Sequence, residues 1–278
     1  MITVFKTPSN KQFFNLVKSS ERELLFCAPF IKKEIIDVIL SLKKPGTVLE
    51  VITSANLANF VSGSLDVEAI KILLANGVRV LNYQNLHAKI YLFDNKKALV
   101  TSANLTNNAL YNNYEYGLLL HEDEQDTVNQ IYSDFISMMD DKELCGSFDK
   151  ESIKEIERFV KILKTNGLVK VDEEGDNLLP IDEKLELSKN LKGWKKDIFD
   201  CLTMIKKQDF SLADVYSFHD ALKIQYPNNN TIHSKIRQTL QQLRDLGFVK
   251  FTEPGKYKKL WLDISVISSG ESTAKASA

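Results

Sequence analysis

Five polar residues within the stretch 86–104 have types and spacings suited to handling a phosphate group. The stretch reads LHAKIYLFDNKKALVTSAN, and these residues are His87, Lys89, Asp94, Ser102 and Asn104. A histidine can act as a nucleophile or as a general acid near neutral pH. A lysine supplies positive charge for the non-bridging oxygens of a phosphodiester, and hydroxyl and amide groups add neutral donors. The combination predicts cleavage of a phosphodiester.

A β-hairpin would bring these residues together. His87 and Lys89 are two residues apart in a run of alternating, β-prone residues, so a strand would direct both side chains to one face. A turn at Asp94 and Asn95 leads to a second strand, at whose end Ser102 and Asn104 share a face. We expect Asp94 to hold the hairpin rather than to transfer a proton. A purely structural hairpin histidine is the alternative for His87.

These segments resemble the phospholipase D superfamily signature, H-x-K-x4-D-x6-G-S-x-N. HAKIYLFD and TSAN match it at every position except Thr101, which stands where the signature has glycine. The resemblance implies a mixed α/β sheet flanked by helices and a phosphohistidine intermediate. No acidic cluster suited to magnesium accompanies the motif, so we expect a metal-free reaction without a cofactor.

The chain contains one copy of this motif. In the superfamily two copies build one active site, with one histidine as nucleophile and the other as general acid. The resemblance therefore implies a homodimer in which His87 of each subunit faces one phosphate across a two-fold axis. Superfamily members often carry a glutamate that bonds to the nucleophilic histidine, and Glu115 is the candidate. A surface glutamate at a strand edge is the alternative.

The composition fits two modest domains without a membrane span. The chain has 278 residues, 44% of them hydrophobic, and a net charge of −1, so contacts with nucleic acid require local basic patches. The isolated cysteines Cys27, Cys145 and Cys201 suit a reducing compartment. No stretch approaches the roughly 20 apolar residues of a membrane helix, and the start lacks a signal-peptide pattern. We therefore expect a soluble, cytoplasmic protein.

Strand-like and helix-like stretches alternate through the first half of the chain, which predicts a sheet covered by helices. We assign residues 1–145 to the catalytic domain and 146–190 to a helical linker. Residues 191–267 form the second domain, and the small, polar residues 268–278 form a disordered tail.

The pattern of residues 191–267 predicts three helices followed by a hairpin. The third helix, 232–246, has an apolar stripe, and its other face is polar. This is the order of a winged helix-turn-helix, whose third helix reads the major groove while wing lysines meet phosphates. The expected DNA-binding residues are His233, Ser234, Lys235, Arg237, Gln238, Gln241, Lys250, Lys256 and Lys258. A helical interaction domain with an ordinary charged face is the alternative.

The segments YPNNNTI and KIRQTLQQLRDLGFVKF resemble the winged-helix module appended to several restriction endonucleases, including a methyladenine-dependent one. The two resemblances together imply a metal-independent, homodimeric endonuclease of double-stranded DNA, similar to type II restriction enzymes. They leave room for a cognate DNA methyltransferase as a partner. The rival hypotheses are a DNA-binding regulator with a degenerate phospholipase D fold used for dimerisation, and a phosphodiesterase acting on phospholipid or RNA.

Overall fold

The computed structural model describes residues 1–84, 86–141, 144–166 and 188–260. The chain divides into two compact units, Met1–Asn166 and Gly167–Ala278. Each unit is described by itself below. The expected tail, 268–278, and the last residues of the expected winged helix, 261–267, lie outside the described residues. No helix among the described residues is long and apolar enough to cross a membrane.

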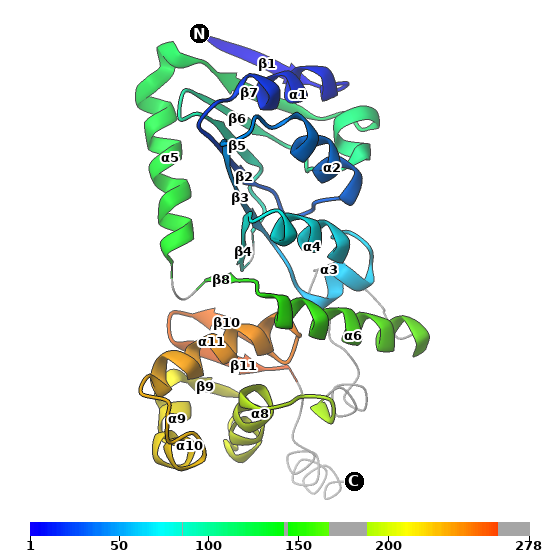
Figure 1. The fold of residues 1–278 in the computed structure, drawn as a ribbon. Helices are drawn as coiled ribbons and strands as arrows, with labels where there is room; N and C mark the ends of the chain where they lie inside the picture. The colour runs from blue at the N-terminus through cyan, green and yellow to red at the C-terminus, as the bar shows by residue number, and fades with distance from the viewer. Residues whose placement is uncertain (85, 142–143, 167–187, 261–278) are drawn as a thin grey trace, which may run out of the picture. The chain divides into compact units, whose positions relative to one another are not determined.

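The first unit is built on an eight-stranded mixed sheet with the strand order β1-β7-β6-β5-β2-β3-β4-β8 (Figure 1). The strands β2, β3 and β4 are parallel, and every other neighbouring pair is antiparallel. The strands are β1 Ile2–Lys6, β2 Glu23–Cys27, β3 Val48–Thr53, β4 Arg79–Tyr83, β5 Ile90–Phe93, β6 Lys97–Thr101, β7 Tyr116–Leu120 and β8 Cys145–Ser147. The predicted mixed α/β sheet flanked by helices is confirmed.

Helices cover both faces of this sheet, with α1, α2 and α4 on one side and α5 on the other (Figure 1). The helices are α1 Asn10–Ser19, α2 Lys33–Leu42, α3 Leu57–Val61, α4 Val67–Ala75, α5 Gln125–Asp140 and α6 Lys150–Asn166, with short turns η1 Asn108–Asn112 and η2 Glu122–Glu124. The strand β2 lies between the two layers, which explains why its sequence is a continuous apolar run.

Residues of β2 alternate between the two cores. Leu25 and Cys27 belong to the core that includes Val128 and Phe135 of α5. Phe26 faces the other way, and its ring packs on Phe13 of α1 with ring centroids 5.7 Å apart. The sheet is therefore held by apolar burial on both sides.

Residues 146–166 belong to the first unit, although the sequence pattern placed them in a helical linker. The strand β8 pairs with β4, and α6 packs against α3 and α4. The apolar side chains of Ile153, Ile156 and Phe159 are buried in this packing. In sequence, an amphipathic helix next to a charged stretch is the same whether it belongs to a linker or to a folded unit. The packing of α6 on α3 and α4 shows that it belongs to the first unit.

The second unit has the helix-turn-helix order that the sequence predicted. It differs by an additional short strand and by the division of the predicted second helix into two helices. Its elements are α8 Trp194–Met204, β9 Asp209–Ser211, α9 Leu212–Tyr216, α10 His219–Gln225, α11 Ile232–Asp245, β10 Val249–Glu253 and β11 Lys256–Lys259. The short strand β9 joins the expected hairpin as a third strand beside β11. The predicted second helix is divided between α9 and α10, and Ser211 begins α9 with a capping box to Asp214.

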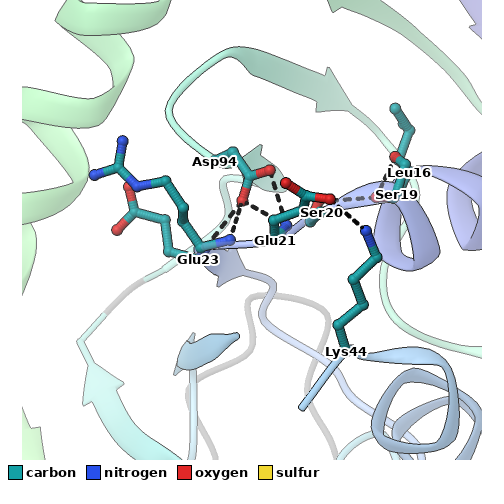
Figure 2. Close-up of polar contacts among 8 residues, drawn as sticks. Leu16, Ser19, Ser20, Glu21, Glu23, Lys44 and Asp94 are labelled. Atoms are coloured by element: carbon teal, nitrogen blue, oxygen red, sulfur yellow. Dashed lines mark hydrogen bonds and ion pairs between the residues drawn. The ribbon is translucent and has the colours of Figure 1, made fainter. Parts of the chain in front are cut away.

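The β5–β6 hairpin is fastened to the loop after α1 by Asp94 (Figure 2). Asp94 and Asn95 form its turn with φ of 58° and 51°, a conformation that Asp and Asn tolerate well. The Asp94 carboxylate accepts hydrogen bonds from the backbone N–H groups of Glu21, Arg22 and Glu23 at 2.8–3.1 Å. Partial burial raises the pKa of Asp94, but these backbone hydrogen bonds outweigh it and the net pKa is lowered.

Thr101 of β6 and Gly117 of β7 are paired in the register of the two strands. A Cβ atom at Gly117 would lie 2.6 Å from the Thr101 Cβ and 2.6 Å from the Val100 carbonyl oxygen. Glycine is therefore required at this position by space rather than by an unusual backbone angle.

We predict that Asp94→Asn lowers the free energy of unfolding at pH 7 by about 1–3 kcal/mol, because it weakens charge-assisted hydrogen bonds while keeping a residue that accepts positive φ. The folded-state pKa of Asp94 is below its unfolded value of about 3.9. The stabilisation is therefore complete above that value and disappears as the pH falls through the folded pKa. Urea unfolding of both proteins between pH 3 and pH 7 measures this difference. An equal free energy of unfolding at pH 7 would contradict the anchoring role.

We predict that Gly117→Ala lowers the free energy of unfolding by about 1–3 kcal/mol through overpacking. The double variant Thr101→Gly/Gly117→Ala should recover part of this loss, because the Thr101 Cβ and Oγ1 are removed while the Val100 carbonyl oxygen remains close to the new methyl group. Thermal and urea unfolding of the two variants and the wild type provide the comparison. A Gly117→Ala protein as stable as the wild type would show that the strands move apart at little cost.

Candidate active site and nucleic-acid interface

The residues of the first unit that the sequence suggests for phosphate chemistry lie at one edge of the sheet. His87 and Lys89 directly precede β5, and Ser102 and Asn104 directly follow β6. Because β5 and β6 are antiparallel, with Ile90 paired to Val100, the start of one strand lies beside the end of the other. Glu115, just before β7, reaches the same edge because β7 is antiparallel to β6.

His87 and Lys89 lie in an irregular segment, not in a strand as the alternating pattern predicted. The strand β5 begins at Ile90, which is paired with Cys27, the last residue of β2. The strand β2 ends at Cys27, so residues 86–89 have no partner strand on the β2 side. The segment is held instead by the buried side chain of Leu86 and by a 3.1 Å bond from the Thr101 N–H to the Lys89 carbonyl.

Lys89 is half-buried beside His87. Its ammonium donates a 2.8 Å hydrogen bond to the His87 carbonyl. Burial lowers the pKa of Lys89, and the negative charge of Glu115 opposes this effect. His87 itself is exposed, and among the described residues its imidazole has no hydrogen-bond partner. The imidazole ring of His87 is therefore accessible to solvent, and the Lys89 ammonium lies close to the same residue.

The thiol of Cys27 lies next to this segment but is not suited to nucleophilic chemistry. Its Sγ contacts the Ala88 carbonyl at 3.7 Å. Burial raises the pKa of Cys27 to about 12, so the thiol stays protonated near neutral pH.

Ser102 and Glu115 form a hydrogen-bonded pair. The Ser102 hydroxyl donates to the Glu115 carboxylate and accepts a 3.1 Å bond from the Tyr116 N–H. Asn113 also donates to this carboxylate, at 3.3 Å, and the Glu115 N–H donates to the Thr7 hydroxyl at 2.6 Å. The family resemblance implied that Glu115 orients His87. In the structure, the partners of its carboxylate are Ser102 and Asn113.

The position of Asn104 is set by backbone contacts that the sequence did not reveal. Its Oδ1 accepts a 3.3 Å bond from the Phe30 N–H, which leaves the amide Nδ2 as the donor for a ligand. The buried Tyr91 hydroxyl donates a 2.7 Å bond to the Ala103 carbonyl and supports the same turn. Sequence reasoning treated Tyr91 only as an apolar strand residue, and the polar hydroxyl in a buried strand was the available signal.

Thr101 occupies the glycine position of the signature without disturbing this turn. Its hydroxyl donates a 3.1 Å bond to the Tyr116 carbonyl and accepts a 3.2 Å bond from the Ala103 N–H. The Thr101 side chain fits because its partner on the neighbouring strand is Gly117, which has no side chain. The serine and asparagine that follow therefore keep their places at the sheet edge.

Asp94 is separated from these residues by the length of the hairpin. It lies at the turn between β5 and β6, whereas His87 and Ser102 lie at the open ends of the two strands. Its carboxylate is occupied by backbone N–H groups, in agreement with a structural part for this residue.

The second unit exposes much of the polar face predicted for α11. His233, Ser234, Arg237 and Gln238 are exposed, while Lys235 and Gln241 are half-buried. The Lys235 ammonium donates a 2.9 Å bond to the Gln238 amide oxygen. The opposite stripe of Ile232, Ile236, Leu240 and Leu243 is buried in the core of the unit. The helix α11 therefore exposes hydrogen-bond donors and acceptors on one face, and its other face is packed into the core of the unit.

Aromatic residues flank the amino-terminal part of α11. The ring of Tyr216 stacks on His233 at 3.8 Å, and His219 meets His233 edge-on at 4.9 Å. Burial raises the pKa of Tyr216, and the neighbouring Arg237 opposes the shift. Sequence reasoning missed Tyr216 and His219, because contact between separate helices has no signal in the spacing of residues.

The lysines of the wing differ in their surroundings. Lys256 is exposed and forms an ion pair with Glu253 at 2.6 Å, while Lys250 and Lys258 are half-buried. Lys259 is only 2% exposed, and its ammonium donates to the Ile205 carbonyl. Arg244, on the charged face in the sequence pattern, is buried with its guanidinium 4.9 Å from the Phe251 ring centroid. These two cations hold the unit together rather than face a ligand.

Comparison with known families assigns each unit separately. Residues 13–139 match the family described as cardiolipin synthase, PLD-like domain, where PLD denotes phospholipase D. Residues 190–259 match the family described as Dam-replacing HTH domain, a helix-turn-helix domain.

The solved structures that resemble this chain include a member of the phospholipase D family. Nuc from Salmonella typhimurium is 15% identical with a TM-score of 0.44, and the match covers 54% of this chain and 99% of that one. NucT from Helicobacter pylori is 21% identical with a TM-score of 0.42, over 53% and 99% of the two chains. Phosphatidylserine synthase from Haemophilus influenzae is 16% identical with a TM-score of 0.45, over 60% and 45%.

Four of the five signature residues, His87, Lys89, Ser102 and Asn104, lie at one edge of the sheet. The two family matches fall in the two units in the order that the sequence predicted. The chain joins a phospholipase D-like domain to a C-terminal winged-helix domain of the Dam-replacing type.

Proposed function

We propose that this protein is a metal-independent DNA endonuclease similar to type II restriction enzymes, in which the phospholipase D-like domain cuts and the winged helix selects the site. The observation that carries the proposal is the convergence of His87, Lys89, Ser102 and Asn104 at one sheet edge, in a chain whose second unit exposes Arg237 and Gln238 on a helix. Nuc and NucT support it by analogy of fold only.

In the proposed reaction, His87 of one subunit attacks the phosphorus and forms a P–N bond as the P–O bond to the leaving group breaks. His87 of the other subunit donates a proton to the leaving oxygen. That second imidazole then takes a proton from water, which attacks the phosphohistidine and releases the product phosphate. The single motif requires the second subunit, because nucleophile and acid must lie on opposite sides of the phosphorus.

The neighbouring residues stabilise the charge on the phosphate. Lys89 supplies the positive charge, and the Asn104 amide donates to a non-bridging oxygen. Glu115 holds the Ser102 hydroxyl in place, so we assign Glu115 a positioning role that acts through Ser102. Its contact with His87, suggested by the resemblance, would require a change of side-chain partner when substrate binds.

The third helix favours double-stranded DNA as the substrate. Arg237 and Gln238 are exposed on α11, and such side chains read guanine and adenine in the wide major groove. The major groove of an RNA duplex is too deep and narrow for this mode of reading. The lysines of the wing, Lys250, Lys256 and Lys258, are positioned on the strands that would meet phosphates.

We predict that the wild-type protein cuts plasmid DNA into discrete fragments in excess EDTA, and that His87→Ala reduces the cleavage rate by at least ~10³-fold because the nucleophile is absent. Digestion of methylated and unmethylated plasmid, followed on gels, measures both the activity and its dependence on methylation. A gel-shift assay should show that His87→Ala still binds DNA. Sustained cleavage by His87→Ala would remove His87 as the nucleophile, and binding without any cleavage by the wild type would favour a DNA-binding regulator.

We predict that Arg237→Ala or Gln238→Ala weakens binding to the cognate site by about 1–3 kcal/mol per lost base contact and relaxes the preference at one base position. Lys256→Ala should instead weaken binding to all sequences and reduce its salt dependence, because it removes a phosphate contact. Binding titrations on cognate and altered duplexes at several salt concentrations separate the two effects. Unchanged specificity in both α11 variants would place other residues in the groove.

A further inference from the structure

The segment that contains Ser102 and Asn104 has a near copy elsewhere in the sequence. Residues 100–105 read VTSANL, and residues 52–57 read ITSANL. One segment begins in β6, which ends at Thr101, and the other begins in β3, which ends at Thr53. We name residues 101–104 the β6 turn and residues 53–56 the β3 turn. The sequence therefore repeats a strand end together with the turn that follows it.

The strand register places the two copies in line across the sheet. Val100 of β6 is paired with Ile90 of β5, and Ile90 is paired with Cys27 of β2. Cys27 is in turn paired with Ile52 of β3, so the first residues of both copies belong to one row (Figure 1). The strands β3 and β6 also run in the same direction, because β3 is parallel to β2 while β2 and β6 are both antiparallel to β5. Both turns therefore leave the sheet at the edge that holds the candidate active site.

The two turns are supported in the same way. In each copy the alanine and the leucine are buried and the asparagine is half-buried. The Ala103 carbonyl of the β6 turn accepts a 2.7 Å bond from the buried Tyr91 hydroxyl of β5. The Ala55 carbonyl of the β3 turn accepts a 2.8 Å bond from the buried Asn82 amide of β4. In both cases a buried side chain of the neighbouring strand thus fixes the alanine carbonyl.

The loop between β2 and α2 contacts both turns. The Thr53 hydroxyl of the β3 turn donates a 2.9 Å bond to the Pro29 carbonyl. On the other side, the Phe30 N–H donates to Asn104 Oδ1 at 3.3 Å, and the Leu105 N–H donates to the Phe30 carbonyl at 3.2 Å. Because β6 and β3 are three strand spacings apart, the two strand ends are separated by roughly 14 Å. One loop therefore holds two similar turns at a fixed separation.

The β3 turn carries two hydrogen-bond donors that the fold does not use. Within the described parts of the chain, the Ser54 hydroxyl and the Asn56 Nδ2 have no hydrogen-bond partner. Asn56 Oδ1 accepts a 2.8 Å bond from the Asn59 N–H, which leaves Nδ2 as the donor for a ligand, as in Asn104. Hydroxyl and amide groups of this kind contribute many of the contacts between proteins and the phosphates of DNA.

The β3 turn lacks the groups needed to cut. Residues 40–51, which precede it, contain no histidine, so this copy has no counterpart of His87 and Lys89. A turn with neutral donors and no nucleophile is suited to binding a phosphate without reacting with it.

We propose that the β3 turn is a second phosphate subsite, in which the Ser54 hydroxyl and the Asn56 amide bind a phosphate of the DNA backbone other than the one that is cut. The inference rests on the proposed function, because it takes the polynucleotide as the substrate. Each strand of a duplex carries a phosphate every ~3.4 Å along the helix axis, so one molecule of DNA presents phosphates to both turns. The subsite would hold the backbone in position while His87 attacks.

The test compares Ser54→Ala and Asn56→Asp with the control Ser41→Ala in the full-length protein. Asn56→Asp keeps the oxygen that bonds to Asn59 and replaces the donor by a negative charge. Ser41 is an exposed serine near the end of α2. Ser54→Ala should raise the KM for DNA about three- to tenfold through the loss of one hydrogen bond. Asn56→Asp should raise it further, because it places a like charge beside the phosphate.

A small substrate and a modified DNA provide further readouts, and thermal unfolding checks that each variant folds. Bis(p-nitrophenyl) phosphate has one phosphate and cannot occupy both turns. The ratio of DNA cleavage to cleavage of this diester should fall in Ser54→Ala and keep its wild-type value in Ser41→Ala. A single methylphosphonate replaces one charged phosphate oxygen of DNA by a methyl group. At one position away from the cut it should weaken binding by the wild type, and it should have a smaller effect in Ser54→Ala.

The outcomes separate this inference from the proposed function. Wild-type KM values for DNA in Ser54→Ala and Asn56→Asp, with the same methylphosphonate effects as in the wild type, would overturn the subsite and leave the nuclease proposal intact. Equal losses on DNA and on the small diester would place Ser54 in the cutting site and would also overturn a separate subsite. A wild type that cuts neither substrate would overturn the proposed function and this inference with it.

Discussion

The central constraint in this structure is the antiparallel pairing of β5 with β2 on one side and β6 on the other. This pairing ends at Cys27, where β2 leaves the sheet, and the chain before β5 is therefore free to form an irregular segment. His87 and Lys89 lie in that segment, which has no partner on the β2 side and is bonded to Thr101 of β6 on the other. The other end of the same hairpin is fixed by Asp94, whose carboxylate is bonded to three consecutive backbone N–H groups. A rigid hairpin, anchored at its turn, thus presents its open end as a site, which agrees with the general rule that precise sites are built on regular elements.

The site edge combines an exposed ring with a restrained group of donors. Lys89 is partly desolvated, which lowers its pKa but strengthens its interaction with a bound anion. Ser102 is held by the Glu115 carboxylate and the Tyr116 backbone, and Asn104 is held by the Phe30 N–H. These side chains are oriented before a ligand arrives, which reduces the cost of reorganisation during the reaction. The chain departs from the signature at Thr101, which stands where the signature has glycine. Its partner across the strands is Gly117, whose lack of a side chain leaves room for the threonine.

Two kinds of surface remain available for recognition. On α11 the exposed polar side chains stand on a buried apolar stripe, and the stacked rings of Tyr216 and His233 restrict their movement. On the sheet, Val4, Val100 and Leu118 are exposed on strands that carry charge only at Lys6 and Lys97. The first surface offers hydrogen-bonding groups, and the second offers apolar side chains. The cations Arg244 and Lys259 would be counted with the DNA-binding set by composition alone, yet both are buried.

The amino-acid sequence alone specified the α/β class of the first unit and the winged-helix order of the second, and it indicated the candidate site residues. Those features depend on spacing along the chain: the H-x-K and S-x-N separations, the period of two in strands and the apolar stripe of the third helix. The folded structure was needed to show that α6 packs on α3 and α4, that Glu115 binds Ser102, and that Thr101 faces Gly117. It also revealed which apolar strand residues are uncovered. These features depend on which surfaces meet, and contacts between segments distant in the chain leave no periodic signal in one sequence.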